Sequence, residues 1–293
     1  MKTFNIQKIL IPIDFSDTSM LAIEHAGFTA QLFKAELILL HVIEKHWEQF
    51  SVVAPELRIS TPNELTGAIE KKLSEIASDI QKKYGVKSFH VTSTGNIFNE
   101  ILSVSKEYNA DMVVMGTHGT SGVVEFFIGS NTYKMVTKSE CPIISVQSHA
   151  KKLGFTNILL PIDDSAHSRQ KVNHAIVLAK QFASKIHILG LSDSDKEIDV
   201  KKFEIKLEQI EEYIKKCDLP FTRKTVEGKN QSKTTYAYAE TVNADLIVIM
   251  TDQDENLTGR FMGTFAQQII NHSKIPVLTI QPKVANIPWV HPY

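Results

Sequence analysis

The sequence predicts an α/β protein of two tandem doubly wound domains, each a mainly parallel five-stranded sheet with helices on both faces. Three observations support this fold class. The chain has 293 residues, about twice the length of a typical domain. Its first half recurs in its second half, and in both halves short apolar runs alternate with helical patterns. Strands buried on both faces of a parallel sheet carry such continuous apolar runs, and helical crossovers connect them.

The opening strand and helix are the clearest part of the repeat. Residues 8–19 read KILIPIDFSDTS and residues 157–168 read NILLPIDDSAHS, so each apolar strand ends in Pro-Ile-Asp before a Ser-rich helix start. The helices that follow share their spacing of buried positions. Counted from Asp14 and from Asp163, the equivalent residues are Ala26, Ala30 and Phe33 in the first copy, and Ala175, Ala179 and Phe182 in the second.

The later elements of the repeat follow in the same order. The strand LILLHV corresponds to IHILGL, and two further strands lie in the pairs NADMVVMG with NADLIVIM and ECPIISVQ with KIPVLTIQ. Amphipathic helices are predicted at 69–83 and 203–214, after insertion loops at 43–68 and 192–202. The expected organisation is a first domain at 1–147, a linker at 148–155, a second domain at 156–282 and a Pro-rich tail at 283–293.

Composition narrows the function classes. A formal net charge of -1 and a pI near 6.8 offer no basic surplus for nucleic acid or an anionic membrane. No segment approaches the ~20 apolar residues that span a bilayer. Cys141 and Cys217 lack the spacing of a disulfide framework or a thiolate zinc site. These features predict a cytoplasmic protein.

The stretch with the most chemical information directly follows the strand MVVM. It reads MGTHGTSGVVEFFIGSNTYKMV, in which Gly116, Gly119 and Gly129 precede a helix that begins with Ser130. Glycines let a backbone approach a ligand closely, and the first N–H groups of a helix attract anions. In a doubly wound sheet this loop lies opposite the end of the first strand, where Asp14 would suit a ribose hydroxyl. The pattern therefore favours a bound phosphate chain.

The glycine spacing, together with Pro12-Ile13-Asp14, resembles the universal stress protein family, and the resemblance covers nearly the whole chain in two copies. It implies Rossmann-like domains and, in the ATP-binding branch of the family, ATP (with AMP or ADP as alternatives) and Mg²⁺. No catalytic and no metal-ligating residue is predicted. One departure is Thr120, where relatives often carry Arg or Lys, and its lack of charge would lower affinity for the terminal phosphate. Carried over to this chain, the nucleotide-binding residues are Pro12, Ile13, Asp14, Val42, Met115, Gly116, Gly119, Gly129, Ser130 and Asn131.

The second copy keeps only half of the glycine pattern. Met250 and Gln253 stand at the places of the first two glycines, whereas Gly263 and Thr264 match the last Gly-Ser pair. Side-chain bulk and an acidic loop oppose ATP there, so a structural or regulatory role is expected. The alternative is a divalent-cation site formed by Asp163, Asp164, Asp252 and Asp254.

Other functions stay open at this level. A slow ATPase or self-phosphorylating protein would use Ser130 or Thr132 as acceptor with help from His118. A structural or ligand-sensing relative would not bind ATP at all. An ATP pyrophosphatase of the PP-loop type expects a glycine-rich loop after the first strand, and DFSDTS has no glycine. The resemblance also implies an intramolecular pseudo-dimer through the strands IISVQ and VLTIQ, with a further homodimer left open.

Overall fold

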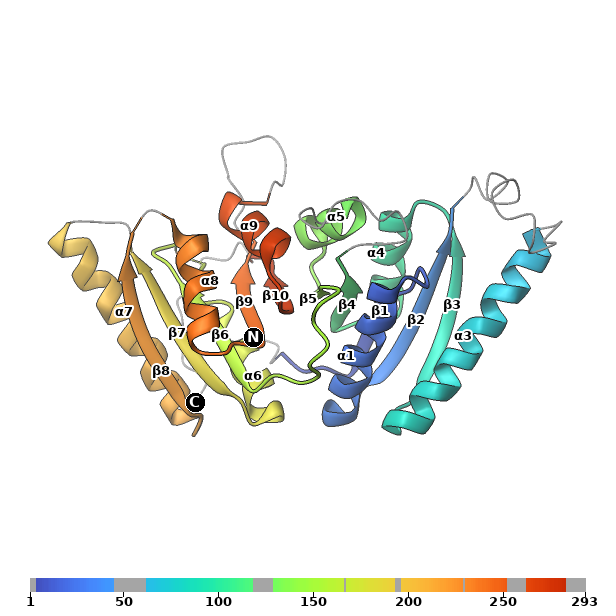
Figure 1. The fold of residues 1–293 in the computed structure, drawn as a ribbon, viewed down its shortest axis with the longest axis horizontal. Helices are drawn as coiled ribbons and strands as arrows, with labels where there is room; N and C mark the ends of the chain where they lie inside the picture. The colour runs from blue at the N-terminus through green and yellow to red at the C-terminus, as the bar shows by residue number, and fades with distance from the viewer. Residues whose placement is uncertain are drawn as a thin grey trace. The chain divides into compact units, whose positions relative to one another are not determined.

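A computed structural model describes residues 4–44, 62–117, 129–165, 167–192, 196–228, 230–251 and 262–282 (Figure 1). The chain forms two compact units. One consists of Asn5–Met135 with Ile143–Leu153, and the other of the chain from Gly154 onward with the short segments Met1–Phe4 and Val136–Pro142. Each unit carries one copy of the repeat as its own α/β structure.

The first copy is a parallel sheet with strand order β3-β2-β1-β4-β5. Right-handed crossovers through the helices place α1 and α3 on one face of this sheet and α4 and α5 on the other. Its elements are β1 (Lys8–Pro12), α1 (Asp17–Phe33), β2 (Glu36–Ile43), α3 (Pro62–Tyr84), β3 (Ser88–Thr94), α4 (Ile97–Glu107), β4 (Met112–Gly116), α5 (Ser130–Lys138) and β5 (Ile143–Val146).

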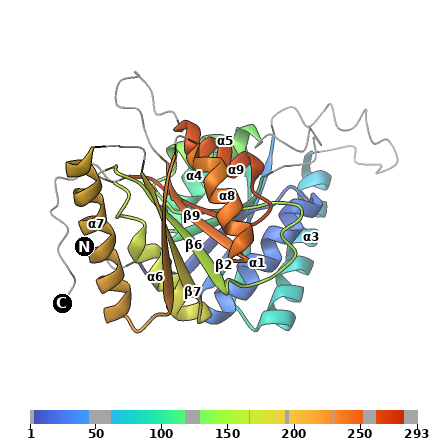
Figure 2. The same ribbon diagram turned by 60° about the vertical axis from the view of Figure 1, so that its left-hand side comes forward.

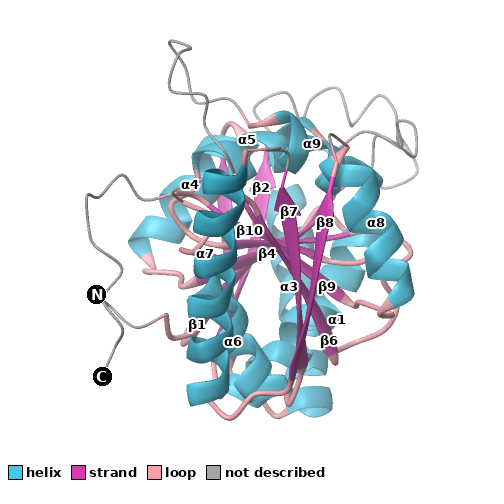
Figure 3. Cartoon of the chain, turned by 90° about the vertical axis from the view of Figure 1, so that its left-hand side faces the viewer, coloured by secondary structure: helices cyan, strands magenta, loops and turns pink. Residues whose placement is uncertain are grey.

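The second copy repeats this arrangement with strand order β10-β9-β6-β7-β8, again parallel. Figures 2 and 3 show β7 and β8 between α6 and α7 on one side and α8 on the other. The predicted fold class is thus confirmed in both copies. The elements are β6 (Asn157–Ile162), α6 (Val172–Phe182), β7 (Lys185–Ser192), α7 (Glu197–Lys216), β8 (Phe221–Glu227), α8 (Gln231–Thr241), β9 (Leu246–Met250), α9 (Thr264–His272) and β10 (Val277–Ile280).

The repeated N-A-D motif explains how the central strand of each sheet is anchored. Its asparagines, Asn109 and Asn243, adopt the left-handed conformation with φ of 53° and 49°, which asparagine tolerates better than most residues. Its aspartates accept backbone N–H groups from the start of the neighbouring strand, Asp111 from β1 and Asp245 from β6. The matching sequences therefore form equivalent local structures in both copies.

The predicted insertion loops are too long at their C-terminal ends. Helix α3 begins at Pro62 and α7 at Glu197, so residues 62–68 and 197–202 are helical instead of loop. Both helices start with features that favour a first turn, namely proline at its first position in α3 and acidic residues in both. Most residues of these first turns face solvent and carry no apolar periodicity, which is why the pattern missed them. The predicted tail at 283–293 lies outside the described residues.

Candidate functional site

The ends of three strands of the first copy, β1, β2 and β4, lie next to one another at the carboxyl edge of its sheet. Strand β1 pairs with β2 on one side and with β4 on the other (Figure 1). The chain adds β2 and β3 on one side of β1 and then returns to add β4 and β5 on the other, so the strand order reverses at the boundary between β1 and β4. Ligands of doubly wound sheets bind at this kind of position. The predicted residues Pro12, Val42 and Gly116 lie at the ends of β1, β2 and β4. The observed strand order therefore puts these three predicted residues at neighbouring strand ends, and their role in binding stays a prediction.

Asp14 follows β1 and is held by the helix that comes next. Its Oδ1 accepts hydrogen bonds from the backbone N–H of Ser16 at 3.0 Å and from the Ser16 hydroxyl at 2.6 Å. The Ser16 Oγ also accepts from the backbone N–H of Ser19 at 3.2 Å and so caps the N-terminus of α1. The start of α1 thus fixes one oxygen of the Asp14 carboxylate.

Gly116 is required by the packing of α1. A Cβ atom at this position would lie 2.9 Å from Cγ2 and 3.1 Å from the carbonyl carbon of Thr18, in the first turn of α1. Such distances are shorter than normal van der Waals contact. The glycine after β4 therefore lets the first turn of α1 lie directly against the end of that strand.

The two ends of the glycine loop are tied together, although residues 118–128, including Gly119, lie outside the described part. The backbone N–H of Gly129 donates to the Thr117 carbonyl at 2.8 Å. The Thr132 hydroxyl donates to the Gly116 carbonyl at 3.0 Å. These bonds bring the N-terminus of α5, where Ser130 is exposed, to the end of β4.

The remaining predicted residues differ in what they present. Ile13 and Met115 are 3% and 5% exposed, so their side chains belong to the core and only their backbone is available to a ligand. Val42 and Asn131 are half-buried at the edge of the sheet. The site is therefore formed mainly by backbone groups, with Asp14 and the start of α5 supplying the polar side chains.

Three residues at this edge escaped sequence reasoning. Phe15 has φ of 63°, which is rare for a bulky side chain, and its ring stacks on the His41 ring with a centroid distance of 4.8 Å. The Lys72 ammonium of α3 lies 4.3 Å from the centroid of the Phe15 ring. His41 Nδ1 is also 2.7 Å from the carbonyl oxygen of Ile13. Burial lowers the pKa of His41, and the positive charge of Lys72 lowers it further. The hydrogen bond to the Ile13 carbonyl and the charge of Asp14 act in the opposite direction, but the net pKa is lowered.

The equivalent edge of the second copy holds a buried lysine. Met250 ends β9 at 3% exposure, and α6 begins only at Val172, so residues 167–171 form turns where the equivalent part of α1 is helical. Lys171 is 2% exposed and donates to the Ser168 hydroxyl at 3.2 Å. Burial alone would raise the pKa of Asp163, but the Lys171 charge and hydrogen bonds from Ser165 and Ser168 lower it.

A second lysine closes the same loop. Lys206 of α7 donates to the backbone carbonyls of Asp163, Asp164 and Ser165 at 3.1, 2.8 and 3.2 Å. A divalent cation would compete here with the ammonium groups of Lys206 and Lys171. Within the described ranges, no three His, Cys, Asp or Glu side chains gather where they could hold a metal ion, and Asp252 and Asp254 lie outside those ranges.

Comparison with known proteins shows one family whose sequences match both halves of the chain. A sequence model of the universal stress protein family matches residues 5–147 and again residues 154–281. Universal stress protein YxiE of Bacillus subtilis is 32% identical over 148 residues, 48% of this chain and 98% of that protein. Universal stress protein MJ0577 of Methanocaldococcus jannaschii is 29% identical over 154 residues, 48% of this chain and 94% of that protein.

A solved structure resembles the chain over almost its full length. The crystal structure of a universal stress protein from Archaeoglobus fulgidus covers 96% of this chain and 99% of its own, with a TM-score of 0.74 and 20% sequence identity. At that identity the likeness concerns the fold alone. In the described segments, none of the helices has both the length and the apolar character needed to cross a membrane.

Proposed function

Since this chain belongs to the universal stress protein family, we propose that its first copy binds an adenine nucleotide, ATP with Mg²⁺, at the carboxyl edge of β1, β2 and β4. The observation that carries the proposal is the convergence at this edge of Asp14, the Gly116 end of β4 and the start of α5. Doubly wound sheets bind their ligands at this point. Here the side chains of Ile13 and Met115 are buried, so that mainly backbone groups would face the ligand.

The charge distribution suggests the orientation of the nucleotide. The first N–H groups of α5 have no partner within the helix and carry the positive end of its dipole, so the phosphates are assigned to Ser130 and Asn131. They would lie beside Gly129, whose own N–H donates to the Thr117 carbonyl. A carboxylate repels phosphate, so Asp14 is assigned to the ribose hydroxyls. The half-buried Val42 at the end of β2 is left to contact the base.

The protein acts in this proposal as a binding module that changes its regulatory behaviour when the nucleotide is bound. Slow self-phosphorylation is the second candidate, and the structure separates its two acceptor hydroxyls. Ser130 is exposed at the start of α5, whereas Thr132 is 4% exposed and donates its hydroxyl to the Gly116 carbonyl. Mass spectrometry after incubation with Mg·ATP would find a phosphate on Ser130 if this candidate is correct.

Titration calorimetry with Mg·ATP tests the proposed site. Wild-type protein should bind ATP, and Ser130→Ala should weaken binding about 2- to 10-fold through the loss of one hydrogen bond. Asp14→Asn should weaken it about 10-fold or more, because a charged acceptor is lost. AMP and ADP serve as comparison ligands to measure what the terminal phosphates contribute.

The repeat supplies the matched control. Thr264 occupies the place of Ser130 in the second copy, at the start of α9, so Thr264→Ala should leave ATP affinity unchanged. Absence of ATP binding by the wild type, or equal loss in both alanine variants, would show that the proposed site is wrong.

A further inference from the structure

The loop that carries Asp14 is held from both of its flanks by side chains of other elements. On one flank, His41 of β2 contacts the Ile13 carbonyl through Nδ1 at 2.7 Å. On the other flank, the Phe15 ring stacks on His41 with an interplanar angle of 27° and lies 4.3 Å from the Lys72 ammonium. We call Phe15, His41 and Lys72 the loop clamp. Its contacts surround Asp14 in sequence without using the Asp14 carboxylate.

The backbone at Phe15 needs such a clamp. A φ of 63° places a bulky side chain in the left-handed region, where Cβ approaches the following carbonyl oxygen. Conformations of this kind persist where surrounding contacts over-determine them, and they gather at functional sites. Ring stacking and a cation above the ring face are attractive contacts that offset this strain.

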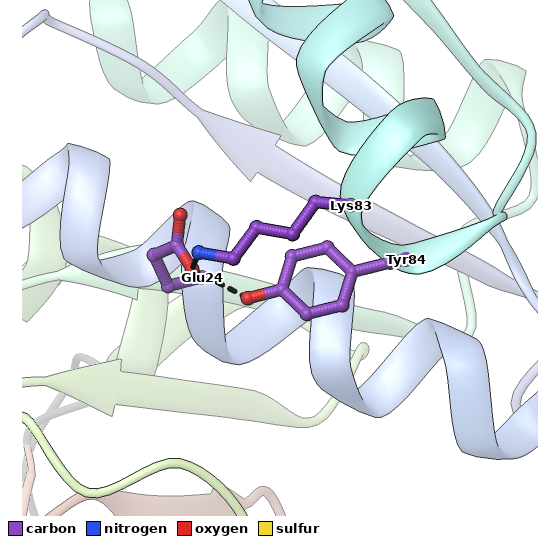
Figure 4. A network of polar contacts seen from close by, with 3 residues as sticks. All are labelled: Glu24, Lys83 and Tyr84. Atoms are coloured by element: carbon purple, nitrogen blue, oxygen red, sulfur yellow. Dashed lines mark hydrogen bonds and ion pairs between the residues drawn. The ribbon is translucent and has the colours of Figure 1, made fainter.

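Helix α3 brings Lys72 to the loop because its C-terminal end is fastened to α1. Figure 4 shows Lys83 and Tyr84 of α3 both donating hydrogen bonds to the Glu24 carboxylate of α1. Next to this network, Gly27 gives room for the Tyr84 ring, since a Cβ at Gly27 would lie 2.5 Å from it. The position of Lys72 over Phe15 therefore follows from helix packing.

The second copy uses the equivalent lysine differently. Lys206 occupies the place of Lys72 in the repeated helix, but Asp164 replaces Phe15 and does not adopt a positive φ. Lys206 instead donates to three consecutive backbone carbonyls of its loop. In the copy with the intact glycine pattern, the lysine (Lys72) therefore contacts the Phe15 ring, whereas in the other copy the equivalent lysine (Lys206) binds backbone carbonyls of the loop.

We propose that Phe15, His41 and Lys72 are positioning residues of the nucleotide site, which hold the β1–α1 loop so that Asp14 presents its free carboxylate oxygen to the ribose hydroxyls. This inference rests on the proposed function of the same site. Lys72 acts through Asp14 and not on the phosphates, so its effect should depend on the ribose hydroxyls of the ligand.

Calorimetry with ATP and with 2′,3′-dideoxy-ATP tests this dependence. Lys72→Met keeps the apolar stem and removes the charge, and it should weaken ATP binding about 3- to 10-fold. The same variant should bind dideoxy-ATP as the wild type does, because that ligand lacks the hydroxyls that Asp14 would contact. Lys72→Arg, which keeps a cation over the ring, should recover ATP affinity to within about twofold.

The controls separate this inference from the proposed function. Lys206→Met alters the matched lysine of the second copy and should not change ATP affinity. In ligand-free protein, NMR titration should show the pKa of His41 rising in Lys72→Met, since the Lys72 charge contributes to lowering it. Equal losses for ATP and dideoxy-ATP, or no loss, would overturn the clamp while ATP binding stands. A wild type that binds no ATP would overturn the proposed function and the inference with it.

Discussion

At the scale of single residues, the largest difference between the two copies is a buried charge. Lys171 is almost fully buried in the second copy, where the equivalent residue of the first copy is Ala22. A buried ammonium is tolerated only with a partner of opposite charge and further hydrogen bonds. Ser168 accepts a hydrogen bond from Lys171, and the Lys171 charge lowers the pKa of Asp163. The aspartate that matches Asp14 in sequence is therefore stabilised in its charged form by a buried lysine.

The Lys171–Asp163 pair leads to a prediction on stability and pH. Lys171→Met should lower the free energy of unfolding by about 3–5 kcal/mol at neutral pH, because it removes the charge that does most to stabilise the buried Asp163 carboxylate. Chemical denaturation monitored by circular dichroism would measure the change. In the wild type the pKa of Asp163 is lowered, so its contribution is present above the unfolded-state pKa and is lost as pH falls through the folded-state pKa.

The variant should have the opposite pH dependence. With Lys171 removed, only the hydrogen bonds from Ser165 and Ser168 still oppose the effect of burial. The pKa of Asp163 should then rise above its unfolded-state value, so acidification should recover stability by protonating the carboxyl group. Adding Asp163→Asn to Lys171→Met should restore part of the lost stability and remove this pH dependence. A constant difference between wild type and Lys171→Met across the acid range would contradict the pairing.

At the scale of elements, the start of the first helix and the residue after the fourth strand change together. In the first copy α1 begins at Asp17 and lies against Gly116. In the second copy Met250 stands in place of that glycine, and α6 begins later, at Val172. A side chain at the end of the strand and a helical first turn compete for the same volume, because interiors are close-packed.

A substitution at Gly116 tests this competition. Gly116→Ala should destabilise the protein by about 1–3 kcal/mol, because the added Cβ conflicts with Thr18. The control is Gly67→Ala in α3, where an added Cβ meets nothing within 4 Å and should stabilise by about 0.5–1 kcal/mol. Thermal unfolding of both variants measures the difference. Similar melting temperatures for the two would show that α1 does not need the glycine.

At the scale of the whole molecule, two copies of one fold present different side chains at equivalent edges of their sheets. The first copy keeps an edge rich in backbone groups, whereas the second places Met250, Lys171 and Lys206 at the equivalent edge. Titration with ATP should therefore give a stoichiometry of one nucleotide per chain, and a value of two would contradict the assignment.

The expected pairing of the two copies within one chain stays a prediction. Light scattering after size-exclusion chromatography should then give the mass of a single chain, 32.9 kDa, with or without ATP. A mass of two chains would favour a homodimer instead.

Much of this organisation can be read from sequence because its signals are local. The apolar runs of β1 and β6, the N-A-D motif and the glycines after β4 are each contained in one short segment, and the same physics acts wherever they occur. Because the sequence is repeated, each of these elements can be predicted from two separate segments of the chain. The ends of neighbouring parallel strands meet at one edge of a sheet, and the sequence predicts the proposed site at that edge.

What the sequence by itself determined was the doubly wound fold and its duplication, and it predicts the edge at which a ligand would bind. Only the tertiary structure showed that Phe15, His41 and Lys72 contact one another and that the charge of Lys171 acts on Asp163. The clamp joins a loop, a strand and a distant helix, and the pair depends on where a helix begins. Such contacts arise from packing between elements, so no short stretch of the chain carries their signal.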